Sequence, residues 1–167
     1  MACDGDPTMT NPPDWLPPMV VVDPWGHNTF DMLYAVFEHD FKDTTPFYEG
    51  TVVWYFPEIE DGKEVVFWHL THREQGFRGE RLPDMRRCER LPWVRAIIDN
   101  SNKPEVLAWD YKEGNGSIHT YLWLKHFDFI VLMKKYRDGR RRLITSYFID
   151  YPHKRRKLEK KYQKRIA

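Results

Sequence analysis

Four strand-like runs separated by short connections fill the second half of the chain and constrain its fold most strongly. The runs are Glu105–Trp109, Ser117–Trp123, Phe127–Met133 and Arg142–Ile149. Turn-forming or short connecting residues at 114–116, 125–126 and 138–139 separate them. Strands joined this closely pair antiparallel, because parallel neighbours need a long crossover connection. The second half therefore predicts a four-stranded antiparallel meander.

The first half predicts helices and one pair of strands. Apolar residues recur at helical spacing from Phe30 to Phe41, which predicts an amphipathic helix. Thr51–Phe56 and Glu64–His72 have the composition of strands and are separated by a turn signal. Residues 83–100 predict a helix with Pro92 inside it. Because proline interrupts helical hydrogen bonding, we expect two short helices or a kink there.

Length and composition indicate a single domain. The chain has 167 residues, and 16% of them are aromatic, enough to fill a core. Residues 1–18 are rich in Pro, Asp, Asn and Thr and predict a flexible leader, and Met19–Val22 is a candidate edge strand. We expect an α+β fold over residues 19–167. The antiparallel meander is packed by helices, after an N-terminal helix and strand pair and before a basic C-terminal helix.

Cysteine and histidine content argues against a disulfide framework and against a metal site. Cys3 and Cys88 are the only cysteines, so a reduced, cytoplasmic setting is the simplest interpretation. His69 and His72 form the only close histidine pair, and in a strand they would point to opposite faces. We expect no metal and no cofactor. No apolar run approaches the length needed to span a bilayer.

Positive charge is gathered in the last quarter of the chain. Residues 134–167 contain 14 Lys and Arg against 3 acidic residues, a net charge of +11, whereas residues 1–133 have a net charge of −10. A dense basic segment favours nucleic acid as a partner, because cations that neutralise phosphates release condensed counterions. The predicted helix His153–Arg165 carries much of this charge. The alternative is a solvated terminal helix that only keeps the protein soluble.

Nine basic residues of this quarter are candidate nucleic-acid contacts. They are Arg140, Arg141, Arg142, Lys154, Arg155, Arg156, Lys157, Lys160 and Lys161. Between these two basic segments runs the last predicted strand, on which Thr145 and Tyr147 share one face. Their hydroxyls could hydrogen-bond a phosphate, and Tyr147 could stack on a base or take part in proton transfer. The alternative is that both are simply good strand residues.

Histidine beside arginine indicates acid–base chemistry at a phosphodiester. His72-Arg73 ends a predicted strand, and His153 begins the basic helix as a candidate proton shuttle. Arg86 and Arg90 could line one helical face and clamp phosphates with their guanidinium groups. A surface lattice of salt bridges is the competing interpretation of these arginines.

Three blocks of the sequence resemble a family of nucleases. The blocks are LPDMRRCERLPWVRAII, YLWLKHFDFIVLM and RLITSYFIDYPHKRRKLEKKY. They look like the phage-associated Barnase–EndoU–colicin–RelE-like nucleases, which are metal-independent RNases of toxin and mobile-element systems. The resemblance covers roughly the last hundred residues, from about Trp68 onward, and the first 50 residues have no counterpart in it.

The resemblance implies RNA cleavage without a metal, leaving a 2′,3′-cyclic phosphate and a 5′-hydroxyl. The active face would be the concave side of the meander, flanked by the preceding helix. The implied catalytic residues are His72, Arg87, Arg90, Thr145, Tyr147 and His153, with Lys157 beside the last. His72 or His153 would act as base or acid, Arg87 and Arg90 would stabilise the transition state, and the two hydroxyls would position the phosphate.

The implied partners are RNA and a neutralising antitoxin or immunity protein. Two other classes of function stay open. The protein could be a non-catalytic nucleic-acid-binding or virion-associated protein, which predicts salt-sensitive binding with intact RNA. It could instead be a protein-interaction module of a mobile element, in which the acidic residues 1–133 dock a basic partner or fold against the basic end of the same chain.

Overall fold

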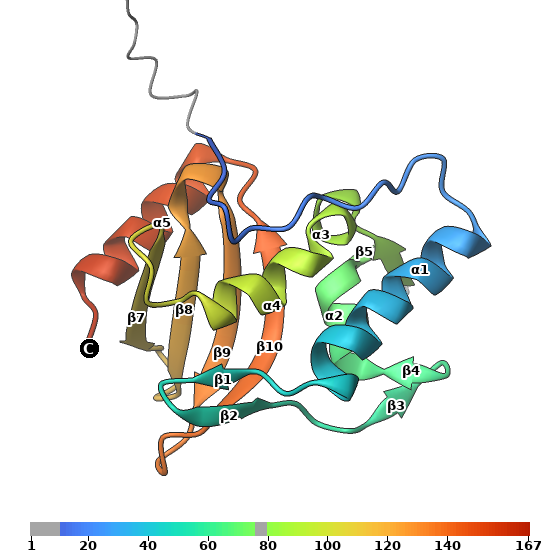
Figure 1. The fold of residues 1–167 in the computed structure, drawn as a ribbon. Helices are drawn as coiled ribbons and strands as arrows, with labels where there is room; N and C mark the ends of the chain where they lie inside the picture. Colours follow the sequence, from blue (N-terminus) through green and yellow to red (C-terminus); the bar gives the residue numbers. More distant parts are fainter. Residues whose placement is uncertain (1–10, 76–79) are drawn as a thin grey trace, which may run out of the picture.

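Six strands form the central sheet of the computed structural model, which describes residues 11–75 and 80–167 (Figure 1). The strands are β1 (Phe47–Tyr48), β2 (Thr51–Trp54), β7 (Val106–Lys112), β8 (Ile118–Leu124), β9 (Phe129–Lys135) and β10 (Arg141–Phe148). Their order is β1-β2-β10-β9-β8-β7. Neighbours from β7 to β10 pair antiparallel, whereas β2 pairs in parallel with β10. The sheet is thus larger than the predicted four strands and mixed rather than purely antiparallel.

Helices lie on both faces of this sheet and beside β10. They are α1 (His27–Phe37), the π-helix η3 (Glu38–Asp43) that continues it, α2 (Val65–Thr71), α3 (Met85–Glu89), α4 (Leu91–Asp99), the 3₁₀ turn η4 (Lys125–Phe127) and α5 (Pro152–Gln163). Two short strand pairs flank α2: β3 (Ile59–Glu60) with β4 (Lys63–Glu64), and β5 (His72–Gln75) with β6 (Glu80–Pro83). In Figure 1, α4 crosses the near face and α5 lies behind the sheet. The described residues therefore form one α+β domain.

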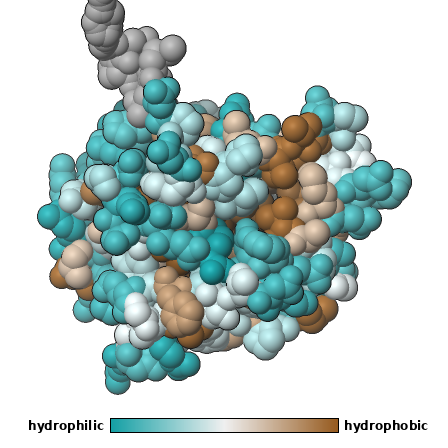
Figure 2. Space-filling model, viewed as in Figure 1, coloured by the Kyte–Doolittle hydropathy of each residue, from teal (hydrophilic) through white to brown (hydrophobic). Residues whose placement is uncertain are grey.

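Two apolar cores fill the two faces. The larger core joins α1, α2 and α4 to the sheet, with Phe37, Phe67 and Trp93 among its buried residues. The smaller core lies under α5, where Leu158 packs with Trp123 and other sheet residues. The surface on the α4 side is mostly hydrophilic, with small apolar patches (Figure 2). Buried aromatic residues on both faces fix the positions of α4 and α5 on one sheet.

The predicted strand Glu64–His72 is wrong, because residues 65–71 form the helix α2. Five of its seven residues are buried: Val66, Phe67, Trp68, Leu70 and Thr71. A short segment that is apolar on nearly every side shows no helical period, and its β-branched and aromatic residues imitate a strand. The predicted break near Pro92 is confirmed. α3 and α4 meet at Arg90, and Pro92 lies in the first turn of α4, where its missing N–H costs no helical bond.

The N-terminal segment runs along the domain where it is described. Residues 1–10 of the predicted leader lie outside the described part. In the rest of it, the indole Nε1 of Trp93 donates to the carbonyl oxygen of Pro17 at 2.9 Å. The predicted edge strand Met19–Val22 is wrong, although the N–H of Val20 donates to the carbonyl of Glu89 at 2.9 Å. Among the described helices, none is long and apolar enough to cross a membrane.

Candidate active site and nucleic-acid interface

Three rows of side chains cross the sheet on the side that carries α5. Residues paired across neighbouring strands point to the same side, so the strand register defines the rows. The rows are Tyr111–His119–Lys134–Arg142, Trp109–Tyr121–Leu132–Thr145 and Leu107–Trp123–Ile130–Tyr147. α5 covers the part around Trp109, whose ring lies 5.4 Å from that of Tyr162. We call this side of the sheet the α5 face. At β10 it carries Thr145 and Tyr147, next to α2 and α3.

Arg87 and Thr145 meet at the end of α2. The Arg87 guanidinium Nη1 donates to the carbonyl oxygens of His69 and His72, at 2.9 Å each. The Thr145 hydroxyl donates to the same His69 carbonyl at 2.8 Å. The last carbonyls of a helix have no partner within the helix, so both contacts satisfy groups that would otherwise be unpaired. The structure therefore brings these two predicted site residues together and holds Arg87 beside β10.

A cavity of about 300 Å³ opens beside this junction and brings His72 and Arg87 together. Its lining residues are Trp68, His69, His72, Arg73, Arg81 and Arg87. The side chain of His72 is only 7% exposed, and its Nδ1 lies 2.7 Å from the Thr71 hydroxyl. Burial, followed by the charges of Arg81 and Arg87, lowers the pKa of His72 to about 4. Its imidazole is therefore neutral at pH 7.

Tyr147 lies two residues beyond Thr145 on β10, in the row of Trp123 and Ile130. Its ring packs beside the core under α5. Burial raises the pKa of its phenol, the Arg87 guanidinium lowers it, and the Glu113 carboxylate raises it. The two charges that act on this phenol thus come from α3 and from the residue that follows β7. Arg87, Thr145 and His72 form a first group of polar residues beside β10.

The second group is a cluster of Glu113, His119, Tyr121 and Lys161, of which the sequence predicts only Lys161 as a site residue. One Glu113 carboxylate oxygen, Oε2, lies 3.0 Å from His119 Nδ1 and accepts from the Tyr121 hydroxyl at 2.5 Å. Lys161 Nζ donates to Glu113 Oε1 at 3.0 Å and to the Tyr121 oxygen at 2.8 Å. The alternation of His119 and Tyr121 along one strand could have indicated a shared face. Nothing local could have placed α5 above it.

Arg90 and His153 do not join the other predicted catalytic residues. The Arg90 side chain lies over the rings of Phe148 and Trp93, on the α4 side of the sheet, and only 9% of it is exposed. The prediction that Arg90 lines the active face is therefore wrong, because α3 turns it into the core. His153 is exposed in the first turn of α5 and stacks on Tyr151, with ring centroids 5.7 Å apart.

Some basic residues of α5 that are predicted to contact nucleic acid form ion pairs within the protein, and others do not. Lys154 pairs with Asp150, Arg155 with Asp128, and Lys161 with Glu113. Three further cations are exposed and have no hydrogen-bond or ion-pair partner within the described residues: Arg156, Lys157 and Lys160. Helical spacing places Lys157 on the same stripe as His153 and Lys161, facing the α5 face, with Arg156 and Lys160 on the next stripe. These residues form a cationic margin beside the face.

The three arginines at the start of β10, Arg140 to Arg142, point in different directions. Arg141 is 4% exposed and bonds to Thr120 and Asp110 on the α4 side, so its prediction as a nucleic-acid contact is wrong. A buried carboxylate across the sheet holds it there. Arg142 lies on the α5 face, in the same row as Lys134. Arg140 pairs with Asp138 at the hairpin turn.

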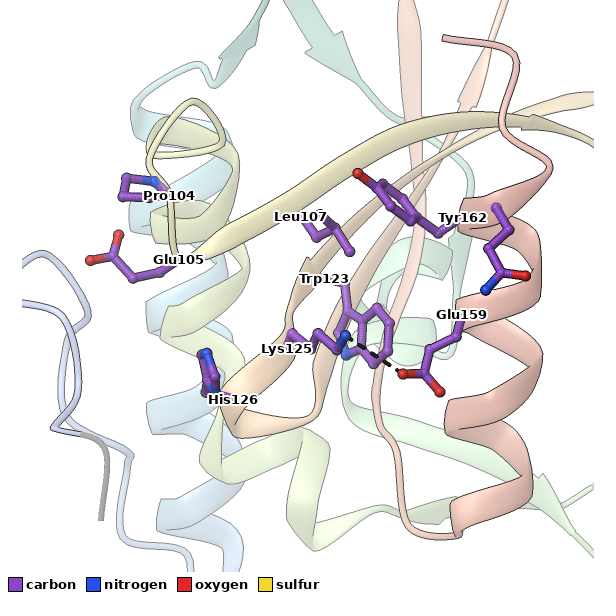
Figure 3. A pocket seen from close by; sticks show the side chains of 9 residues that line it. Pro104, Glu105, Leu107, Trp123, Lys125, His126, Glu159 and Tyr162 are labelled. Atoms are coloured by element: carbon purple, nitrogen blue, oxygen red, sulfur yellow. Dashed lines mark ion pairs between the residues drawn. The ribbon is translucent and has the colours of Figure 1, made fainter. Parts of the chain in front are cut away.

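A further cavity, of about 390 Å³, lies on the opposite flank of α5. Figure 3 shows it, with the Trp123 ring and Tyr162 at its wall and the ion pair of Lys125 and Glu159, 3.5 Å apart, across it. Within the described part of the chain, no group of three His, Cys, Asp or Glu residues could hold a metal ion. No protein-family model, curated protein or solved structure matches this chain.

Proposed function

We propose that this protein is a metal-independent endoribonuclease whose active site is the α5 face between α2 and α5. The ribose 2′-hydroxyl attacks the adjacent phosphate and leaves a 2′,3′-cyclic phosphate and a 5′-hydroxyl. One observation carries the proposal. Arg87 and Thr145, which both donate to the His69 carbonyl, lie at one border of a sheet face whose other border, on α5, carries cations without a protein partner among the described residues. In this proposal β7 to β10 serve as the catalytic meander of a Barnase–EndoU–colicin–RelE-like nuclease.

The RNA backbone lies along the exposed stripe of α5 in this proposal. Arg156, Lys157 and Lys160 have no protein partner among the described residues, so binding a phosphate breaks no ion pair of theirs. Each cation that neutralises a phosphate releases a counterion and adds to the salt dependence of binding. Leu132 and Tyr147, half-buried residues of the α5-face rows on β9 and β10, offer surfaces against which bases can pack.

In this proposal, Arg87 and Tyr147 stabilise the negative charge that develops around phosphorus. Attack by the 2′-oxygen places negative charge on the non-bridging oxygens, and fixed donors stabilise that charge without reorganisation. The contacts of Arg87 with two carbonyl groups and with Asp84 hold its guanidinium in one orientation. The Tyr147 phenol keeps its proton, because its pKa is raised overall, and can donate it in a hydrogen bond.

Binding of RNA without cleavage is the alternative function. The observation that favours it is that Arg87 and Thr145 both donate to carbonyl oxygens of α2, which are structural roles. In that case the cationic margin alone accounts for function, in a nucleic-acid-binding or virion-associated protein. A neutralising antitoxin or immunity protein with an acidic surface over α5 belongs to the nuclease proposal, as does a cytoplasmic setting.

Incubation of the purified protein with mixed RNA in excess EDTA tests the proposal. The nuclease hypothesis predicts fragments that carry 2′,3′-cyclic phosphate and 5′-hydroxyl ends. Intact RNA, or cleavage only after a divalent metal is added, rejects it. Intact RNA with salt-sensitive binding establishes the alternative.

A further inference from the structure

The Glu113–His119 pair has the geometry of an oriented general base. An ionised carboxylate only accepts hydrogen bonds, so the 3.0 Å contact with Glu113 requires Nδ1 of His119 to carry the proton. The other ring nitrogen, Nε2, is then a proton acceptor. Within residues 11–75 and 80–167 this nitrogen has no hydrogen-bond partner, and the side chain is 22% exposed to solvent.

The surroundings of Glu113 keep it ionised and fixed. Burial raises the pKa of Glu113, but hydrogen bonds from Tyr121 and Lys161 outweigh burial and leave the pKa below its ordinary value. Tyr121 is held in turn by stacking on Trp109, with ring centroids 4.9 Å apart and planes 6° apart. A carboxylate with three partners from β8 and α5 has one orientation in which to hold the imidazole.

His119 also faces the proposed RNA path. It lies in the row of Lys134 and Arg142 on the α5 face, and Lys161 next to it belongs to the same helix as the unpaired cations. Lys134, which pairs with His119 across β8 and β9, is a cation that can hold a phosphate beside the imidazole. The geometry points to His119 as the general base of the proposed ribonuclease, positioned by Glu113, with RNA as the substrate. This inference rests on the proposed function.

The chemical step balances with these groups. Nε2 of His119 takes the proton of the 2′-hydroxyl as the 2′-oxygen forms its bond to phosphorus. The bond from phosphorus to the 5′-oxygen breaks, and that oxygen takes a proton from a water molecule. The imidazolium formed at His119 is stabilised by Glu113 and then returns its proton to solvent.

Two substitutions distinguish a catalytic role of His119 and Glu113 from a structural role in holding α5 against the β7–β8 hairpin. His119→Asn places an amide N–H where Nδ1 stands, so the bond to Glu113 is kept while the base is removed. Glu113→Gln still accepts from Lys161 but offers an N–H to the imidazole, which moves the ring proton to Nε2. His39→Asn is the matched control, because His39 Nδ1 also contacts a carboxylate, that of Asp40 at 2.9 Å, on η3.

Steady-state cleavage of an RNA oligonucleotide in EDTA is the measurement. We expect His119→Asn and Glu113→Gln to lose about 100-fold or more in kcat, with KM within about threefold of wild type. In a third variant, His119→Ala, we expect added imidazole to restore activity. His119→Asn within about threefold of wild type overturns the inference and leaves the nuclease proposal standing. If the site variants lose activity because they unfold, and imidazole does not restore activity to His119→Ala, the cluster has only a structural role. That result also overturns the inference. Wild-type protein that leaves RNA intact refutes the proposed function itself.

Discussion

At the scale of single residues, Tyr147 is the side chain whose chemistry the nuclease proposal depends on most. Tyr147→Phe removes one hydroxyl and keeps the ring that packs beside the core under α5. We expect cleavage to fall by about 10- to 100-fold, because one hydrogen bond to the developing charge is lost. Melting temperature should change little.

Initial rates on the same RNA in EDTA check this prediction. Tyr55→Phe is the matched control, since its hydroxyl makes only a 3.5 Å contact with the Phe41 carbonyl on the α1 side. Equal cleavage rates for Tyr147→Phe and wild type would show that the Tyr147 hydroxyl takes no part in catalysis.

His72 makes stability depend on pH. Its pKa is about 4 in the folded protein, against about 6.5 in an unfolded chain. Between these values the unfolded chain binds a proton that the folded protein does not, so the free energy of unfolding falls as pH drops from 6.5 to 4. The loss is on the order of 2–3 kcal/mol.

Urea unfolding of wild type and His72→Gln at pH 7 and pH 4 measures this loss. The carboxylates titrate in both proteins and cancel in the comparison. We expect wild type to lose roughly 2 kcal/mol more than the variant over this range. If wild type and His72→Gln lose the same free energy of unfolding between pH 7 and pH 4, His72 is not held neutral by burial.

At the scale of elements, the proposed function assigns the nucleic-acid contacts to α5. A triple variant with Arg156, Lys157 and Lys160 changed to Gln leaves the four ion pairs of the helix intact. We expect weaker RNA binding at low salt and a smaller slope of log affinity against log salt, by roughly 2 for single-stranded RNA. Lys103→Gln, an exposed position before β7, is the control. Fluorescence anisotropy at several salt concentrations gives the slope. An unchanged slope in the triple variant would show that RNA does not bind along α5.

Elements differ in how well the sequence predicts them. The periodic helix at residues 30–41 and the break at Pro92 follow from local rules, and both are confirmed within a few residues by α1 with η3 and by α3 with α4. The sequence predicts a strand where α2 lies, because burial on almost all sides removes the helical period by which a helix is recognised. The parallel addition of β2 to β10 joins residues about ninety positions apart, which no local pattern contains.

At the scale of the whole molecule, the candidate site is assembled from distant parts of the chain. Alternation along β10 was enough to predict that Thr145 and Tyr147 share a face, and their register shows that they do. The contact of Lys161 with Glu113 depends on how α5 crosses the sheet, and the inward turn of Arg90 depends on the packing of α3. Charge counted along the sequence also could not show that Arg141 is buried against Asp110.

Cleavage of an RNA oligonucleotide that carries a single 2′-deoxy nucleotide tests the central claim most directly. In EDTA, the nuclease account predicts that cleavage stops after the substituted nucleotide and continues at the other sites, because the attacking oxygen is missing only there. Fragments elsewhere should end in 2′,3′-cyclic phosphate. Cleavage that proceeds after the 2′-deoxy nucleotide, or that requires a divalent metal, would contradict the account.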